Sequence, residues 1–301
     1  MSAVPVAVVS PAAGIRQAVG DYVALTKPRI ILLLEVTALA AMLVAQAGFP
    51  PLVVVASTLV GGALAASGAN AINMWFDRDI DAEMNRTRLR PIPSGRIQPV
   101  AALAFGITLN AIAFVVVAAG ANVLAATLTM AATLYYVFVY TMWLKRSTPQ
   151  NIVIGGAAGA FPPLIGWAAA TGGLDLVAVY MFAIIFFWTP PHFWALAIRL
   201  KGDYGRANVP MLTEVAGGAV TRRQVVLYTV LLVLVSLMPL LRGFGPFYAG
   251  SALLLGGGFL YMSLRLLRDP GTLWARRTFL YSIPYLGLVF TAMVVDSLVR
   301  G

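Results

Sequence analysis

The feature that most constrains this chain is a succession of long apolar stretches joined by short polar links. A helix of about 20 apolar residues is long enough to cross the hydrocarbon core of a bilayer. Nine such stretches predict spans near residues 29–47, 52–75, 99–118, 122–142, 150–170, 176–198, 223–241, 246–265 and 278–298. Only 11% of the 301 residues are charged, whereas soluble domains carry about 25%. The sequence therefore predicts an all-α polytopic membrane protein with nine transmembrane helices, embedded in a lipid bilayer.

The spans follow one another too closely to leave room for a soluble domain, and the sequence shows no internal repeat. We therefore expect residues 26–301 to form one nine-helix domain. Residues 1–25 are interpreted as a cytoplasmic N-terminal tail and not as a cleaved signal peptide, because prolines interrupt their apolar run and no charged segment precedes it. The chain contains no cysteine, which excludes disulfides, thiol catalysis and cysteine-bound metals.

The positive charges predict how the chain is oriented. All of the 21 lysines and arginines except Arg242 and Arg300 fall in the N-terminal tail or in alternate links. Because cytoplasmic loops are enriched in these residues, we expect a multi-pass protein of the cytoplasmic (inner) membrane. Its N-terminus and the loops 76–98 and 199–222 would lie in the cytoplasm, and its C-terminus outside. This asymmetry accounts for most of the net charge of +10, and nothing else in the sequence supports nucleic acid as a partner.

Four of the eleven acidic residues lie in one stretch, residues 70–96, which also contains five arginines. Asn73, Asp77 and Asp81 are spaced four residues apart, so on a helix they would form one oxygen-lined face. Mg²⁺ takes oxygen ligands and is commonly held by one or two carboxylates together with phosphate oxygens, and guanidinium groups pair with phosphate. A magnesium–phosphate site is one interpretation of this stretch, and a solvated mixed-charge loop between two helices is the other.

A second polar segment, residues 199–212, falls on the same predicted side of the membrane. Asp203 is surrounded there by three cations that include Lys201, and Tyr204 adds a hydroxyl. Asp203 could complete a second metal site or orient a lysine that binds phosphate. An ordinary positively charged cytoplasmic loop is the alternative.

The sixth span contains Pro190, Pro191 and His192, the only histidine of the chain. Proline removes a backbone hydrogen bond from a helix, so we expect the helix to be interrupted here. His192 would lie about 10 Å below the polar loop, and ionisable groups inside a span are candidates for function. A neutral histidine satisfied within the fold is the alternative. Neighbouring aromatic residues, including Trp188 and Trp194, serve either packing or the stabilisation of a carbocation by their ring faces.

The fifth span carries a second proline pair, Pro162-Pro163, which predicts another break. Its Gly155, Gly156 and Gly159 predict the close approach of a neighbouring helix.

Two charged loops at one end of an apolar bundle indicate an amphiphilic substrate with an anionic head and a long tail, and an isoprenyl diphosphate fits this description. Lys145 and Arg146 end the fourth span on the same side, either as membrane anchors or within reach of the diphosphate. Mg²⁺ and basic residues would stabilise the diphosphate as a leaving group. The tail and the emerging allylic cation would lie between helices, away from water.

The motifs that contain these residues resemble a known family. The N-x-x-x-D-x-x-x-D motif with its arginine-rich loop, and the second polar loop after the sixth of nine spans, resemble the UbiA superfamily of intramembrane prenyltransferases. Within it, the chain is similar to the members that farnesylate haem, through the segments DRDIDAEMNRTRLRPIPSG, LKRSTPQNIVIGG, WTPPHFWALA and DYGRANVPML. The resemblance covers residues 25–298 and implies a UbiA-like bundle.

The resemblance implies transfer of a farnesyl group from farnesyl diphosphate to a vinyl group of haem B (protohaem IX), with addition of water, giving haem O and diphosphate. Mg²⁺ would be the cofactor, haem B a substrate and not a cofactor, and a downstream haem-processing enzyme or terminal oxidase assembly the partner that receives the product. The implied metal ligands are Asn73, Asp77, Asp81 and Asp203. The implied diphosphate ligands are Arg86, Arg90, Lys145, Arg146, Lys201 and Tyr204.

Among these residues, the resemblance makes Asp77, Asp81, Lys201 and Asp203 the catalytic set. His192, Trp188 and Trp194 are assigned to the haem pocket. A neutral imidazole can ligate haem iron, but we expect His192 to line the pocket instead.

Two features depart from the family pattern, and two other functions stay open. The second loop has one acid, Asp203, in place of a repeated D-x-x-x-D, and Asn208 stands where we expect glycine. A prenyltransferase acting on a quinone precursor or another aromatic acceptor would share the first motif, but the TPPHFW segment argues for haem. A transporter would also show broken helices beside charges, but the acids are expected to cluster at the cytoplasmic ends of the spans, and none lies mid-span apart from Glu35, near the start of the first span.

Overall fold

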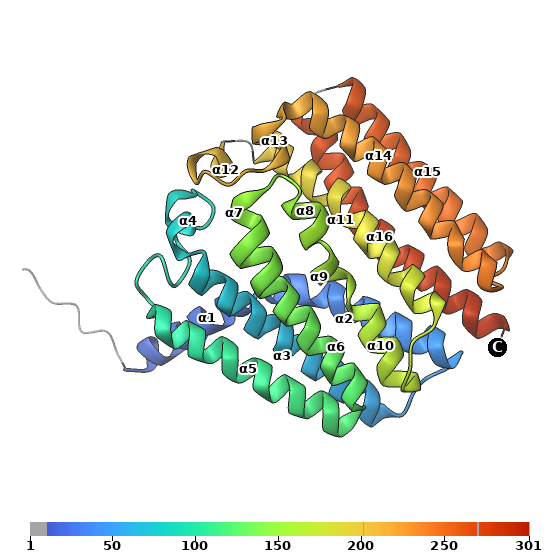
Figure 1. The fold of residues 1–301 in the computed structure, drawn as a ribbon, viewed down its shortest axis with the longest axis horizontal. Helices are drawn as coiled ribbons and strands as arrows, with labels where there is room; N and C mark the ends of the chain where they lie inside the picture. Colours follow the sequence, from blue (N-terminus) through green and yellow to red (C-terminus); the bar gives the residue numbers. More distant parts are fainter. Residues whose placement is uncertain (1–10, 201, 270, 301) are drawn as a thin grey trace, which may run out of the picture.

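The computed structural model describes residues 11–200, 202–269 and 271–300, and for 11–13 and Asp203 it describes the backbone alone. All regular secondary structure within these ranges is helical (Figure 1). Nine segments of this described part are long and apolar enough to cross a membrane, which confirms the predicted number of spans.

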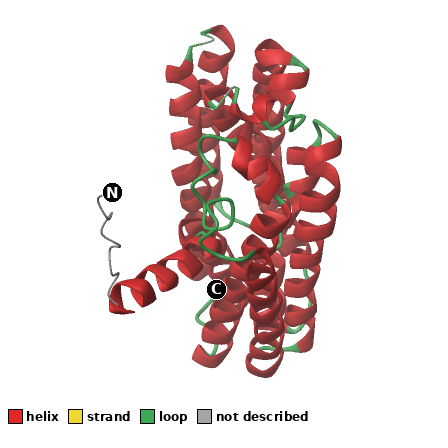
Figure 2. Ribbon diagram, turned by 90° about the vertical axis from the view of Figure 1, so that its left-hand side faces the viewer, coloured by secondary structure: helices red, strands yellow, loops and turns green. Residues whose placement is uncertain are grey.

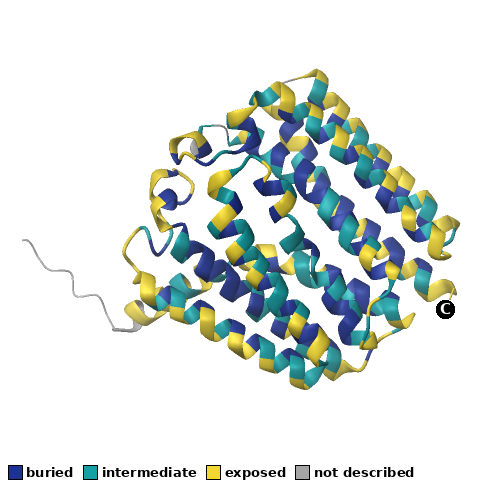
Figure 3. Cartoon of the chain, viewed as in Figure 1, coloured by how far each residue is buried: buried dark blue, intermediate teal, exposed yellow. Residues whose placement is uncertain are grey.

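The nine spans begin and end within a few residues of the predicted bounds, and the largest differences are at the starts of the seventh and ninth spans, which begin at Gly217 and Thr272. They are α2 (Pro28–Gln46), α3 (Leu52–Phe76), α5 (Pro99–Gly120), Val123–Ser147, Asn151–Thr171, α11 (Leu176–Arg199), Gly217–Arg242, α15 (Pro246–Arg268) and α16 (Thr272–Arg300). Buried residues face the inside of the bundle, and the outward faces are exposed (Figure 3). In a bilayer, those outward faces would contact lipid.

The fourth span changes helix type before it reaches the polar loops. It starts as α6 (Val123–Leu134), continues as a π-helix, η1 (Tyr135–Leu144), and ends in α7 (Lys145–Ser147). Long π-helices are rare and are frequently found at functional sites. The sequence analysis did not predict this change of helix type.

The fifth span is broken, as its prolines predict. It consists of α8 (Asn151–Gly155), α9 (Ala157–Ala160) and α10 (Pro162–Thr171). A Cβ atom on Gly155 would lie 2.2 Å from the Tyr140 ring of η1, so only glycine allows this packing. Gly159 was predicted to serve the same purpose, but a Cβ atom there would have no neighbour within 4 Å, so that part of the prediction is wrong.

The predicted interruption of the sixth span is also wrong. The helix α11 continues through Pro190 and Pro191 to Arg199. Proline removes a hydrogen-bond donor from a helix, but the surrounding residues hold α11 in place. Thr189, Pro190 and Pro191 are buried, and the Thr189 hydroxyl donates to the carbonyl of Ile185 at 2.8 Å. Burial against neighbouring helices therefore outweighs the two missing hydrogen bonds.

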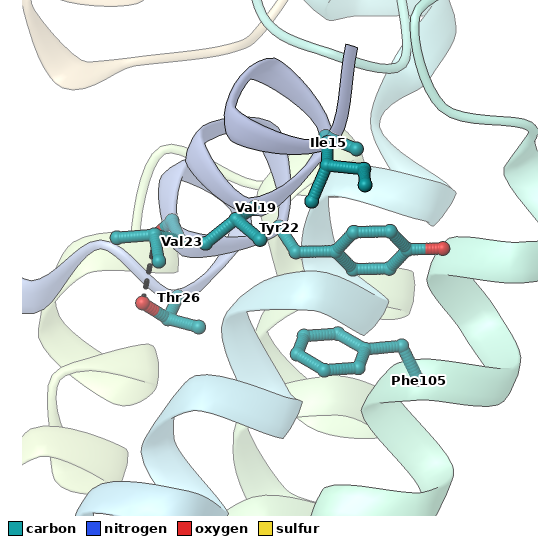
Figure 4. A pocket seen from close by; sticks show the side chains of 7 residues that line it. Ile15, Val19, Tyr22, Val23, Thr26 and Phe105 are labelled. Atoms are coloured by element: carbon teal, nitrogen blue, oxygen red, sulfur yellow. Dashed lines mark hydrogen bonds between the residues drawn. The ribbon is translucent and has the colours of Figure 1, made fainter. Parts of the chain in front are cut away.

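Residues 1–25, which the sequence analysis treated as a tail, include most of a helix, α1 (Pro11–Thr26). This helix lies across the bundle instead of parallel to the spans (Figure 2). Leu25 is fully buried, and the Tyr22 ring meets Phe105 of α5 edge-on at 5.0 Å. Between α1 and α5 is an open apolar hollow that Val19, Tyr22 and Phe105 help to line (Figure 4).

The two polar loops lie at the same end of the bundle, which we call the polar end. The first loop contains the short helix α4 (Arg78–Glu83), and the second contains α12 (Asp203–Arg206) and α13 (Leu212–Val215) (Figure 1). Ile80 and Met84 from the first loop form one buried cluster with Tyr204 and Val209 from the second. The apolar side chains of the two loops thus fix their charged residues near one another.

Candidate active site

Asn73, Asp77 and Asp81 share one face, although the helix that was expected to hold them is interrupted. The helix α3 ends at Phe76 and α4 begins at Arg78. The helical hydrogen-bond spacing nevertheless continues, because Asp77 N–H donates to Asn73 O at 2.9 Å and Asp81 N–H donates to Asp77 O at 2.8 Å. We call these three residues the oxygen stripe.

The oxygen stripe is buried, and the one acid between its members, Asp79, is not. Asn73, Asp77 and Asp81 are at most 3% exposed, whereas the Asp79 side chain is 60% exposed. A solvated mixed-charge loop would expose all of these acids alike. Burying two carboxylates costs free energy unless each is paired and hydrogen-bonded, so the neighbouring cations decide how the stripe is stabilised.

Cations from different parts of the chain contact the stripe, and three of them hydrogen-bond to its oxygens. Lys145 pairs with Oδ2 of Asp77, and Arg90 pairs with Oδ2 of Asp81 at 2.6 Å. Lys27 donates to Oδ1 of Asn73 at 3.1 Å. The end of the fourth span, the arginine-rich loop and the start of the first span therefore converge on one group of oxygens.

One carboxylate oxygen of the stripe has no hydrogen-bond donor among the described residues. Oδ1 of Asp77 is buried and accepts no hydrogen bond from any residue that the structure describes. The Arg146 guanidinium lies 3.5 Å from this oxygen. A buried oxygen without a donor is unusual in a native protein and calls for a missing partner. Carboxylate and amide oxygens, with one carboxylate oxygen unbonded, form a donor set that suits Mg²⁺.

Arg146 lies mainly against Asp79. Its two terminal nitrogens each donate to one Asp79 oxygen at 2.7 Å, and its guanidinium lies 4.7 Å from the centre of the Phe76 ring. These hydrogen bonds hold the pKa of Asp79 at about 2. Arg146 was predicted to bind diphosphate; in the structure it borders the stripe and holds the exposed acid beside it.

Lys27 is a residue that the sequence analysis missed, having counted it only among the charges that orient the chain. It immediately precedes Pro28 and adopts φ +54°, a left-handed conformation that is uncommon outside glycine. Burial, and then the charges of Arg90 and Lys145, lower its pKa to about 7. A lysine directly before the proline that begins a span was the available signal, but an ordinary membrane anchor would look the same.

The side chains of two site residues predicted in the second loop lie outside the described part of the chain. Lys201 lies outside the described residues, as does the side chain of Asp203. Tyr204 is buried in the cluster that joins the two loops. Asn208 has φ +49°, which explains why glycine would be expected at its position and why asparagine is accepted, since it tolerates left-handed backbone better than most residues.

Among the described residues, Arg86 forms no ion pair and the Asn151 side chain forms no hydrogen bond. Arg86 is exposed and forms no ion pair with any described residue, and its contact with the diphosphate stays a prediction. Asn151, the first residue of α8, is fully buried, and neither its Oδ1 nor its Nδ2 has a hydrogen-bond partner in the described part of the chain. It follows the Lys145-Arg146 pair by five residues, but only the structure reveals that it is buried and unpaired.

The residues predicted for an acceptor pocket divide into two groups. His192 stacks on Trp188 with ring centres 4.3 Å apart, and both face α16. Trp194 belongs to another buried cluster, in which it contacts Tyr228 edge-on at 5.3 Å. The structure thus brings Trp188 to His192 and places Trp194 in separate packing.

Nine apolar spans with acids and cations gathered at one end define a class: helical membrane proteins with a buried charged centre at the mouth of the bundle. Residues 34–291 match the UbiA prenyltransferase family, and the chain belongs to this family. The UbiA-like bundle expected from the sequence is thereby confirmed. In keeping with this, the structure of a UbiA homolog from Archaeoglobus fulgidus bound to GPP and Mg²⁺ covers 91% of this chain and 99% of its own, with a TM-score of 0.63 and 15% identity.

Curated relatives are much more similar in sequence. The "Protoheme IX farnesyltransferase" of Symbiobacterium thermophilum is 53% identical over 283 residues, which cover 93% of this chain and 95% of that protein. The protein of the same name from a Roseiflexus species is 52% identical over 280 residues. That match covers 93% of this chain but 52% of the relative, so the chain spans about half the length of the Roseiflexus protein.

Proposed function

We propose that this chain transfers a farnesyl group from farnesyl diphosphate to a vinyl group of haem B, with addition of water, and so forms haem O and diphosphate. The observation that carries the proposal is Asp77, a fully buried carboxylate with one oxygen unbonded, set among cations at the end of an apolar bundle. Two relatives that carry the name of this activity are more than 50% identical to the chain.

In the proposed site, the oxygen stripe would hold Mg²⁺, and the cations around it would hold the diphosphate. Asn73, Asp77 and Asp81 would supply the metal ligands, with Asp203 as a further candidate. Mg²⁺ supplies positive charge that stabilises the diphosphate as it leaves. Lys145 and Arg90 neutralise the carboxylates in the structure, so they are placed to turn to the diphosphate oxygens when metal charge replaces theirs.

The reaction requires the site to separate an anionic leaving group from a carbocation. The bond between farnesyl C1 and oxygen breaks with its electron pair on the diphosphate, and C1 bonds to the outer vinyl carbon. Water then adds to the inner vinyl carbon and loses a proton. The cations of the polar end attract the diphosphate, while aromatic rings such as Trp188 can stabilise positive charge deeper in the bundle.

We also propose that the polar end faces the cytoplasm. Among the described residues, lysines and arginines gather at that end, and Arg242 and Arg300 lie at the other, which is the distribution that the positive-inside rule describes. Reporter fusions after Gly95 and after Gly205 should report the cytoplasm, and a fusion after Gly301 the outside. Finding the first two on opposite sides would exclude a shared site.

The deciding experiment is mass spectrometry of haem extracted after the purified protein has been incubated with haem B, farnesyl diphosphate and Mg²⁺. The expected product is haem carrying a hydroxyethylfarnesyl group. Unchanged haem, together with prenylation of an aromatic quinone precursor offered in parallel, would assign the chain to another acceptor. Flux of labelled farnesyl diphosphate into vesicles without any product would indicate a transporter.

A further inference from the structure

His192 is held at the interface of α11 and α16 by a serine that has no assigned role. Its Nδ1 lies 2.6 Å from Oγ of Ser282. The backbone carbonyl of the same serine accepts the indole N–H of Trp188 at 2.7 Å. Ser282 is fully buried and thus orients both members of the stacked His192–Trp188 pair.

The hydrogen bonds of Ser282 determine where the imidazole proton is. Its hydroxyl has one proton, and it lies 2.7 Å from the backbone carbonyl of Phe279. A carbonyl oxygen can only accept, so the serine proton points to Phe279. With the serine proton used in the bond to Phe279, the serine oxygen is left to accept from His192, an arrangement that requires the imidazole proton on Nδ1.

In a neutral imidazole, one ring nitrogen carries the proton and the other has a free lone pair. With Nδ1 protonated, the lone pair is on Nε2, for which the structure shows no partner among the described residues. The ring cannot easily turn to exchange the two nitrogens, because Trp188 stacks at 4.3 Å and Phe279 lies at 4.8 Å. Nε2 therefore has a fixed position.

We infer that Ser282 is a positioning residue: it holds His192 as the Nδ1–H tautomer so that the bare Nε2 is presented to the acceptor. The ligand class that this nitrogen recognises is a hydrogen-bond donor or an electron-poor metal centre, and the iron of a haem is of the second kind. The inference rests on the proposed function for the identity of the acceptor. The tautomer itself does not depend on it.

Because the chain contains a single histidine, the tautomer can be measured directly. Protein labelled with ¹⁵N-histidine should show one protonated and one bare ring nitrogen, and their couplings to the two ring carbon-bound protons tell Nδ1 from Nε2. We expect a bare Nε2 in the unaltered protein. Ser282→Ala should bring the other tautomer to a comparable population, and Ser282→Thr, which keeps the hydroxyl, should restore the original one.

A matched control is Ser263→Ala. Ser263 is equally buried, and its hydroxyl bonds Thr229 at 3.0 Å instead of the histidine. This variant should leave the histidine spectrum unchanged. A bare Nδ1 in the unaltered protein, or an unchanged tautomer in Ser282→Ala, would overturn the inference.

Titration of each substrate separately connects the tautomer to function. Ser282→Ala should weaken the binding of haem B about tenfold, a change of about 1.4 kcal/mol, while the binding of farnesyl diphosphate stays within twofold. Equal loss for both substrates, or loss for neither, would contradict a positioning role. If the protein does not convert haem at all, the proposed function fails, whereas the spectrum still decides whether Ser282 sets the tautomer.

Discussion

The two ends of the bundle each bury an aspartate, and they do so in opposite ways. At the polar end, Asp77 is fully buried, contacts only side chains, and has an oxygen without a hydrogen bond. At the other end, Asp296 of α16 is 2% exposed and pairs with Arg300 at 2.5 Å. Its oxygens also accept the backbone N–H groups of Gly245 at 2.9 Å and Tyr248 at 3.3 Å.

The comparison shows that burial of a carboxylate does not by itself identify a ligand site. Asp296 satisfies backbone donors at the start of α15 that have no partner within the helix, and its charge suits the positive end of a helix. Its oxygens are committed to fixed groups. The charged partners of Asp77 are the ends of two long side chains, Lys145 and Arg146, which could turn to another anion if the proposed metal ion bound.

The largest effect is expected at Asp77. Asp77→Asn removes a carboxylate from the proposed metal site, and a bound metal ion contributes several kcal/mol to leaving-group stabilisation. Farnesyl transfer should therefore fall at least about a hundredfold, since about 1.4 kcal/mol corresponds to a factor of ten. The rate is measured as product formed per folded protein in detergent with Mg²⁺ in excess. Asp81→Asn should behave in the same way.

The control for this variant is Asp79→Asn, the same substitution two residues away. Asp79 is largely exposed and bonds Arg146 on the outside of the stripe, so its loss should leave most of the turnover intact. Near-normal turnover of Asp77→Asn would mean that the stripe is an ordinary loop and that the two ends of the molecule do not differ in kind.

The second prediction is that the buried aspartate at the end opposite the stripe, Asp296, matters for stability and not for turnover. Asp296→Asn removes the charge from a carboxylate that receives two backbone N–H groups and an arginine, and hydrogen bonds to charged groups contribute about 1.5–3 kcal/mol each. Unfolding free energy should fall by about 2 kcal/mol, measured by thermal or denaturant unfolding in detergent. Turnover per folded molecule should stay within twofold of normal. Loss of turnover without loss of stability would contradict the structural role.

A feature of the fold or the site could be predicted from the sequence when the interactions that produce it join residues close together in the chain. Span positions follow from runs of apolar residues, and the oxygen stripe from a four-residue spacing. The continuity of α11 through Pro190 and Pro191 depends on helices that pack around it, and local propensity cannot show this. Lys27 and Asn73 are 46 residues apart in the chain, and no pattern near Lys27 indicates that they meet.

The third prediction concerns Lys27, the cation that only the structure places in the site. Lys27→Met keeps the length of the side chain and removes the charge that bonds Asn73. A charge-assisted hydrogen bond is worth about 1.5 kcal/mol or more, so at a pH below the Lys27 pKa of about 7, where the ammonium is charged, the KM for farnesyl diphosphate should rise about tenfold while stability changes little. Arg29→Met, two residues along and exposed, is the control and should leave the KM unchanged. A rise for both variants would indicate loss of general attraction by positive charge instead of a specific contact.

The smallest effect is expected at an exposed ion pair on the end opposite the stripe. Arg242 contacts Asp175 at 3.1 Å, and their side chains are 43% and 36% exposed. Exposed pairs contribute about 0–1 kcal/mol, so Arg242→Gln should lower the unfolding free energy by about 0.5 kcal/mol or less and leave turnover unchanged. The measurement is the shift of the unfolding midpoint between low and high salt.

Asp175 makes two interactions, the ion pair with Arg242 and a helix cap, and a substitution at Asp175 tells their contributions to stability apart. Its Oδ1 accepts the N–H of Val177 at 2.8 Å and so caps the start of α11. Asp175→Ala removes the cap and the pair together, and loss of an N-cap costs about 1 kcal/mol. It should therefore destabilise the protein more than Arg242→Gln, by an amount that salt does not abolish, because the capping bond is local. If the two variants lose the same salt-sensitive stability, the ion pair and not the cap is what Asp175 contributes.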